Sequence, residues 1–254
     1  ERGFVSELKC ILPERNCNRV ISPNGVARFL AYDFVPDSDG FFVGVQKVAP
    51  GELWIVDRDN PLIEPIRKKW YKLPFGRVEK LNEKQAMEQL DEQLDVAVQR
   101  CMVSDVPLGV FLSGGIDSSL IAAYACRHVE PSSLKTFSIG FDNPDFDESI
   151  HAQKVANHLG TKHYNLIVDS SDLLDIVPNI LAAQDEPLAD PSIIPTAILS
   201  RFAREEVTVA LGGDGGDELF LGYPTFIAEK LLRSFRWVPN VAFSFMAELA
   251  YKYI

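Results

Sequence analysis

The sequence has 254 residues, of which 46% are hydrophobic and 24% are charged, a composition typical of a folded globular protein with one large domain or two smaller ones. Its 25 Lys and Arg against 36 Asp and Glu leave a net charge of −11, which disfavours broad electrostatic binding to nucleic acid or to an anionic membrane. The sequence contains no apolar run long enough to span a membrane and no signal-peptide pattern, so we expect a cytoplasmic protein whose four cysteines are reduced.

Residues 1–75 are rich in turn-forming residues. Ser22-Pro23-Asn24-Gly25 is one such cluster, and apolar runs such as Leu53-Trp54-Ile55-Val56 lie between the clusters. This pattern predicts short strands joined by turns and loops.

From Asn82 onward the pattern changes to alternating helices and strands. The spacing of apolar residues predicts an amphipathic helix that begins after Asn82, which is a suitable N-cap residue. Such a succession predicts a parallel sheet covered by helices on both faces, with ligands bound beyond the carboxyl ends of the strands. We expect strands at 108–112, 136–141, 164–168 and 207–211, and helices at 118–128, 147–159 and 193–204.

The segment LSGGIDSS, residues 112–119, joins a predicted strand to a predicted helix and is typical of an anion-binding loop. Gly114 and Gly115 allow the backbone to approach a ligand, and the helix N-terminus favours phosphate. Asp117 would repel phosphate unless Mg²⁺ lies between them. The segment lacks the Lys of GxxxxGK[ST], which indicates a loop that holds departing pyrophosphate while the α-phosphate of ATP is attacked. The alternative is an ordinary glycine-rich turn.

A second glycine-rich segment, GGDGGDELFLGY, follows the last predicted strand. It contains three acids, namely Asp214, Asp217 and Glu218. A carboxylate here could face Asp117 across the site as a second Mg²⁺ ligand, while the alternative is a solvated acidic turn.

Together these motifs resemble the synthetase domain of the glutamine-dependent asparagine synthetases, which are class II amidotransferases with an N-type ATP pyrophosphatase domain. FSIGF (137–141), FDES (146–149) and DEPLADPSIIPT (185–196) are similar to further segments of that family, the last leading towards the acceptor-substrate pocket. The resemblance implies an α/β fold of the ATP pyrophosphatase (HUP-like) type at 76–254, incomplete at its C-terminus. It also implies that residues 1–75 are a small β-rich remnant of a glutaminase domain with its linker, so we expect a fragment that lacks both ends.

The resemblance also implies the roles of individual residues. Catalytic roles fall to Asp117, Asp214 and Asp217, with Asp117 and Asp217 on Mg²⁺. Leu112, Ile139, Gly212 and Gly213 would border the adenosine part of ATP. Ser113, Gly114, Gly115, Asp117 and Ser118 would hold pyrophosphate. The chain departs from the family at Asp214, where Glu is frequent, and at Gly212, where Ser is common.

The function implied is an ATP-dependent ligase that adenylates a carboxylate, aspartate in the first place, and transfers ammonia derived from glutamine. The partners are small molecules rather than nucleic acid or membrane, and a homodimer is a candidate assembly. The chain begins with Glu1 rather than the family's nucleophilic Cys, so we do not expect the chain itself to hydrolyse glutamine. Two alternatives stay open, namely a related ligase acting on a sugar, peptide or ring-closing carboxylate, and a non-catalytic nucleotide-binding paralogue.

Two smaller expectations concern residues outside the glycine-rich loops. Among Asp185, Glu186 and Asp190, one acid could lie near a substrate amine, or all three could belong to a polar loop. The four histidines are expected at the surface or at helix ends.

Overall fold

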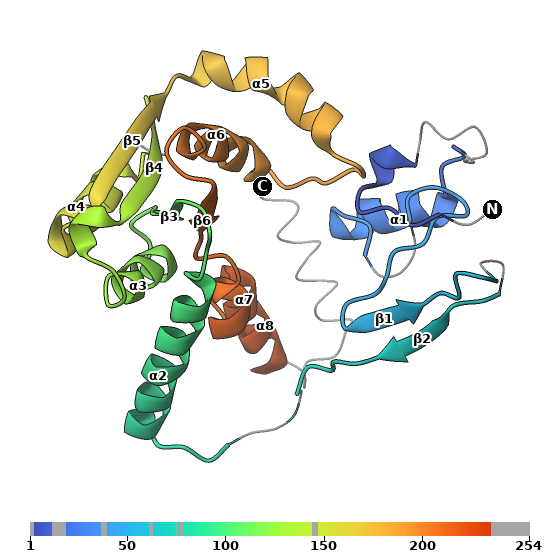
Figure 1. Ribbon diagram of the computed structural model, residues 1–254, viewed down its shortest axis with the longest axis horizontal. Helices are drawn as coiled ribbons and strands as arrows, with labels where there is room; N and C mark the ends of the chain where they lie inside the picture. Colours follow the sequence, from blue (N-terminus) through green and yellow to red (C-terminus); the bar gives the residue numbers. More distant parts are fainter. Residues whose placement is uncertain are drawn as a thin grey trace. The chain divides into compact units, whose positions relative to one another are not determined.

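The computed structural model describes residues 3–11, 19–36, 40–60, 63–74, 76, 79–143 and 147–234, and Figure 1 labels its elements in chain order. The chain divides into two compact units. The first is formed by Glu1–Gln93, Ile139–Asp147 and Leu166–Glu205, and the second by Leu94–Ser138, Glu148–Asn165 and the chain from Glu206 on. The domain division expected at residue 75 stays a prediction. Cys17 and Trp237 lie outside the described residues.

A sheet of four strands organises the part of the chain that carries the predicted site. Its strands are β3 (Leu108–Phe111), β4 (Lys135–Phe141), β5 (Lys162–Val168) and β6 (Val209–Leu211), in the spatial order β5-β4-β3-β6. β3 pairs in parallel with both neighbours, with Gly109 beside Lys135 on one side and beside Ala210 on the other. Counted from β3, this order is 3-2-1-4, as in doubly wound folds. The order reverses between β3 and β6, where ligands of such sheets bind.

Both faces of β4 are buried. Thr136, Phe137 and Ser138 follow one another in this strand, and each is at most 2% exposed. Because successive side chains of a strand point to opposite faces, the burial of three in a row means that both faces are covered. The predicted α/β class with a parallel sheet is therefore confirmed.

Small side chains let two helices approach this sheet closely. α3 (Ile116–Ala125) and α4 (Ser149–Leu159) pack on each other, and they share an apolar core with Val110 of β3. Ala122 and Ala152 of these helices are completely buried. Gly160 ends α4 at φ 77°, the left-handed conformation that glycine adopts without strain.

The helix predicted after Asn82 is α2 (Glu83–Cys101). Asn82 Oδ1 accepts a hydrogen bond from the Gln85 amide at 2.9 Å, and Gln85 Oε1 accepts one from the Asn82 amide at 3.2 Å. This reciprocal pair is a capping box and confirms Asn82 as the N-cap. Of the residues whose spacing predicted this helix, Ala86, Leu90 and Ala97 are exposed and Leu94 is half-buried, whereas the buried residue is Val98, which is 4% exposed.

The first unit combines a small sheet with helices. Its elements are η1 (Leu8–Cys10), α1 (Pro23–Tyr32), β1 (Glu52–Ile55), β2 (Ile66–Lys69), α5 (Ser170–Ala183) and α6 (Ile193–Ala203). β1 and β2 pair antiparallel, with Trp54 opposite Arg67 and the Arg67 guanidinium 4.2 Å above the indole ring. The strand expected around Trp54 is thus confirmed.

The turn expected at residues 22–25 is wrong, because these residues begin α1. Ser22 is its N-cap and accepts a hydrogen bond from the Gly25 amide at 3.2 Å, while Pro23 occupies the first helical position. Ser and Pro favour a helix start for the same local reasons that they favour a turn. The helix then ends at Asp33, which has a left-handed backbone with φ 65°.

Besides α1, the described residues form three further helices that were not predicted, namely α5, α7 (Gly216–Phe220) and α8 (Pro224–Ser234). α5 contains Pro178 in its interior, where proline removes a helical hydrogen bond. Among the described residues, no helix combines the length and the apolar character that crossing a membrane requires. Cys10, Cys101 and Cys126, the cysteines within that part of the chain, are not in disulfides.

Candidate functional site

The loop between β3 and α3 is shaped by Gly114. This residue has φ +84°, and a Cβ at its position would lie only 2.6 Å from the backbone nitrogen of Ala152 and from the Cβ of His151. The first turn of α4 therefore packs directly on the loop. Gly114 is required both for its backbone conformation and for this close approach.

Two serine hydroxyls hold the same loop together. Ser118 Oγ accepts a hydrogen bond from the Ser113 amide at 3.2 Å and lies 3.0 Å from Ser113 Oγ. Ser113 Oγ in turn accepts from the Gly115 amide at 3.2 Å. The two hydroxyls thus satisfy backbone groups of the loop, and their predicted contact with pyrophosphate stays a prediction.

The loop after β6 lies against this first loop. A Cβ at Gly213 would be 2.7 Å from the Ser118 amide nitrogen and 3.0 Å from the Cβ of Asp117. A Cβ at Gly216 would be 2.5 Å from Cγ of Asp117 and 2.7 Å from its Oδ2. The Asp117 carboxylate therefore rests on the backbone at the start of α7. The structure brings both predicted motifs together at the switch point of the sheet.

The other two predicted catalytic acids point to different places. Asp214 folds back so that its Oδ2 occupies the space where a Cβ of Gly212 would lie. Asp217 turns its Oδ1 to Gly222, beyond the end of α7. The pairing of Asp117 with Asp217 on one Mg²⁺ ion therefore stays a prediction.

A buried hydroxyl next to the first loop has no partner within the described part of the chain. Ser119 Oγ in the first turn of α3 is buried and has no hydrogen-bond partner among the described residues, so a phosphate oxygen or a water molecule would satisfy it. In that part of the chain no three His, Cys, Asp or Glu residues are grouped as metal ligands. Magnesium bound through phosphates usually takes one or two protein carboxylates, and the assignment of Asp117 and Asp217 to that role stays a prediction.

The residues expected beside adenosine lie at the sheet. The side chain of Leu112 is 1% exposed and packs in the apolar core, and its amide donates to the Phe137 carbonyl at 2.8 Å. Only the backbone of Leu112 could therefore border a nucleotide. Ile139 lies half-buried on β4, and Gly212 and Gly213 follow β6 directly. Their contact with adenosine stays a prediction.

Glu218 is ionised and held at the end of the second loop. The Tyr223 hydroxyl donates to Glu218 Oε1 at 2.7 Å, and this bond lowers the pKa of the Glu218 carboxyl below its ordinary value. The bond ties the end of α7 to the turn before α8.

His163 is the polar residue whose environment the sequence analysis missed. The expectation of a surface or helix-end position is wrong for it, because His163 lies on β5 between the hydroxyls of Thr136, 2.9 Å from Nδ1, and Ser138, 3.1 Å from Nε2. Ser138 also donates to Asn165 Oδ1 at 2.8 Å. Burial lowers the pKa of His163. The alternation of polar and apolar residues in both strands was the signal for this ladder.

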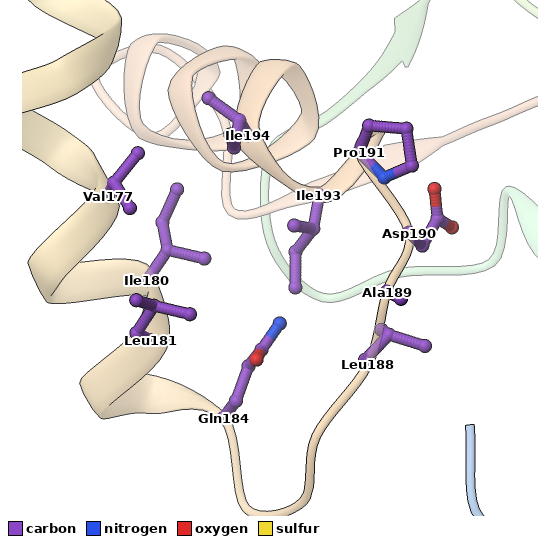
Figure 2. A pocket seen from close by; sticks show the side chains of 10 residues that line it. All are labelled: Val177, Ile180, Leu181, Gln184, Leu188, Ala189, Asp190, Pro191, Ile193 and Ile194. Carbon is purple, nitrogen blue, oxygen red and sulfur yellow. The ribbon is translucent and has the colours of Figure 1, made fainter. Parts of the chain in front are cut away.

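A cavity of about 310 Å³ lies between α5 and α6 in the first unit. Figure 2 shows Ile180, Ile193 and the amide of Gln184 reaching into it, while the Asp190 carboxylate turns away from α5. Asp190 Oδ1 accepts from the Ser192 amide at 2.9 Å. The cavity is lined by Val177, Ile180, Leu181, Gln184, Leu188, Ala189, Asp190, Pro191, Ile193 and Ile194.

Comparison with known proteins identifies the family. A family model described as asparagine synthase matches residues 89–253, most of the chain including both glycine-rich loops. This chain belongs to the asparagine synthase family. The resemblance inferred from the motifs is thereby confirmed.

Relatives in the asparagine synthase family match nearly the whole chain. Asparagine synthetase [glutamine-hydrolyzing] 1 of Bacillus subtilis is 35% identical over 93% of this chain and 36% of its own length. Putative asparagine synthetase [glutamine-hydrolyzing] 2 of Methanocaldococcus jannaschii is also 35% identical, over 93% of this chain and 46% of its own length. The chain thus spans between about a third and a half of these curated relatives.

Among solved structures, the NH3-dependent NAD synthetase of Campylobacter jejuni has a TM-score of 0.38 and 19% identity, covering 54% of this chain and 60% of its own. The NMN synthetase of Francisella tularensis has a TM-score of 0.37 and 18% identity, covering 57% and 59%. Likenesses this weak carry no functional argument, which depends on the site itself.

Proposed function

We propose that this chain supplies the adenylating part of an ATP-dependent amide-forming ligase. A carboxylate oxygen of the substrate attacks the α-phosphate of ATP, and pyrophosphate leaves. Ammonia then attacks the acyl-adenylate, which gives an amide and AMP. Aspartate is the simplest acceptor, and in the full-length protein the ammonia would come from glutamine.

The observation that carries this proposal is the contact of the two loops. Gly213 and Gly216 have no side chains, and this allows the loop after β6 to lie on Asp117 in the loop after β3. If the loop after β3 were an ordinary glycine-rich turn, there would be no need for the second glycine-rich loop to pack on Asp117. The contact lies at the switch point of a doubly wound sheet, the ligand-binding position of this architecture.

The residues around this contact have separate tasks in the proposed reaction. The first-turn amides and the dipole of α3 would bind pyrophosphate. Asp117 and Asp217 would hold Mg²⁺, which stabilises the charge that develops on the departing pyrophosphate. Asp214 would face the acceptor or ammonia, with its reach set by Gly212.

The cavity between α5 and α6 is the candidate acceptor pocket. Its wall at residues 188–194 belongs to the segment DEPLADPSIIPT, which resembles the family segment leading towards the acceptor. Gln184 offers an amide to a polar substrate.

Exchange of labelled pyrophosphate into ATP tests the chemistry directly. We would assay the full-length protein with Mg²⁺ and a panel of carboxylic acids that includes aspartate. We expect exchange that depends on aspartate and is abolished in Asp117→Asn. Asp57→Asn is the matched control, because Asp57 is an acid whose carboxylate bonds only locally, to Asp59 and Asn60. Binding of ATP without exchange for any acid would contradict adenylation and favour a non-catalytic paralogue.

A second candidate is a ligase of the same mechanism with another acceptor. The chain is 28% identical, over 84% of its length, to amidase chry2 of Gibberella zeae, whose name does not mention asparagine. The departures at Gly212 and Asp214 also lie in the loop that would face the acceptor. Exchange that depends on a different acid in the same panel would select this candidate.

A further inference from the structure

The acids Asp185 and Glu186, which line a second cavity of about 200 Å³, bind the N-terminal part of the chain. Asp185 Oδ2 accepts a hydrogen bond from the Leu8 amide at 2.6 Å, and its Oδ1 accepts one from the Lys9 amide at 3.2 Å. Both amides belong to η1. An ionised acceptor makes a stronger hydrogen bond to an amide than a neutral one does.

Glu186 makes a second connection to the N-terminal segments. Its Oε1 accepts from the Phe41 amide at 3.0 Å, and its Oε2 accepts from Lys47 Nζ at 2.6 Å. Lys47 also donates to the Val35 carbonyl at 2.6 Å. The Glu186 side chain is only 18% exposed, so this ion pair is partly shielded from solvent. Breaking one partner of such a pair leaves a poorly solvated charge.

Further bonds join the same two parts of the chain on either side of these acids. Lys9 Nζ donates to the Ala183 carbonyl at 3.3 Å, and the Ala189 amide donates to the Asp33 carbonyl at 2.9 Å. The segment 183–189 is therefore held at both ends and in the middle by residues 8–47. It leads directly into the cavity wall at 188–191.

We propose that Asp185 and Glu186 are positioning residues that hold this wall in place by binding the N-terminal segments, and that neither contacts substrate. Both oxygens of each carboxylate already accept a hydrogen bond from the chain. Before the wall enters α6, it is held further by the bond from the Ala189 amide to the Asp33 carbonyl. When these bonds are removed, the wall would move and the pocket would bind its ligand more weakly.

Hydrogen exchange measured by mass spectrometry on the full-length protein tests the positioning without any assay of activity. In Asp185→Asn we expect faster exchange of the peptide with Leu8 and Lys9, by about tenfold for the loss of a charged hydrogen bond. In Lys47→Met we expect faster exchange of the segment 35–47. Asp190→Asn is the matched control in the same loop, because the Asp190 carboxylate accepts a local hydrogen bond from the Ser192 amide rather than one from the N-terminal segments. Unchanged exchange in both variants would overturn the proposal, as would an increase spread over α2 to β6.

A kinetic measurement separates positioning from a purely structural role. This arm rests on the proposed function, and it uses Glu186→Gln, in which Oε1 still accepts from Phe41 while the bond to Lys47 is lost. We expect the KM for the acceptor to rise about tenfold while the KM for ATP stays unchanged. Faster hydrogen exchange with an unchanged KM for the acceptor would overturn the positioning role. A raised KM for the acceptor without faster hydrogen exchange would overturn it too, because it would indicate direct contact with substrate. If no acid supports turnover, the proposed function fails and hydrogen exchange alone decides.

Discussion

At the scale of single residues, several glycines of the two loops are important because they have no side chain. Gly114, Gly213 and Gly216 lie where a Cβ would collide with neighbouring backbone or with Asp117. Gly215 has a left-handed backbone but open space around it. The glycines of the two loops therefore have different functions, and substitution can separate them.

Gly114→Ala should destabilise the protein more than Gly215→Ala. Both substitutions force an alanine into the left-handed region, at a cost of roughly 1–2 kcal/mol. Gly114→Ala also pushes a methyl group into α4, which we expect to add about 1–3 kcal/mol. Urea unfolding of the two variants measures the difference, and equal loss of stability would show that α4 does not pack on the loop.

Gly212→Ala should change the site without unfolding it. The added Cβ would meet only Oδ2 of Asp214, the end of a movable side chain, and Gly212 does not have a left-handed backbone. We expect the Asp214 carboxylate to move and pyrophosphate exchange to fall by about tenfold to a hundredfold. The same substitution in an Asp214→Asn background should have a much smaller effect. Equal effects in both backgrounds would mean that Gly212 does not position Asp214.

At the scale of elements, the ladder between β4 and β5 gives the fold a dependence on pH. Ser138 donates to Asn165, so Ser138 accepts from His163 Nε2. Thr136 Oγ1 lies 2.9 Å from Nδ1 and 3.0 Å from Thr161 Oγ1, so it can take either role toward the imidazole. Burial favours the neutral imidazole, because it lowers the pKa of His163.

His163 should therefore make the protein less stable in mild acid. Its pKa is lower in the folded than in the unfolded chain, so below about pH 6.5 the unfolded chain takes up a proton that the folded chain resists. The free energy of unfolding falls as the pH drops from there through the lowered folded pKa, and the loss is complete below that pKa. Unfolding of His163→Gln at several pH values should show a smaller slope than the wild type, and His158→Gln should retain the slope. An identical slope in His163→Gln would contradict the neutral ladder.

The order of the elements was predictable from the sequence where hydrophobic periodicity was clear, as for α2, β3 and α4. It was not predictable where one residue type serves two structures. Ser22 and Pro23 could equally start a turn or a helix, and Pro178 lies inside α5 because tertiary packing outweighs its local preference. The two loops could be found by motif alone. That Asp185 and Glu186 bind Leu8 and Phe41 depends on chain segments far apart in sequence, which no local pattern encodes.

At the scale of the whole molecule, ATP binding should stabilise the fold. A ligand that binds only the folded chain raises the free energy of unfolding by about 2.7 kcal/mol at a concentration one hundred times its Kd. Thermal unfolding of the full-length protein with ATP and Mg²⁺ should thus show a higher Tm than without them. Asp117→Asn should lose most of that increase and Asp57→Asn none of it. An increase of the same size in Asp117→Asn would place the nucleotide elsewhere.

The contact of Gly213 with Asp117 has a consequence for synthesis on the ribosome. The two residues are roughly a hundred positions apart, so closing the loop between them is slow compared with forming the local elements. A growing chain that has emerged only as far as β6 would carry the phosphate loop without the second loop. Such a chain could not yet place the backbone of the second loop against Asp117, so this contact forms only after the segment beyond β6 has emerged.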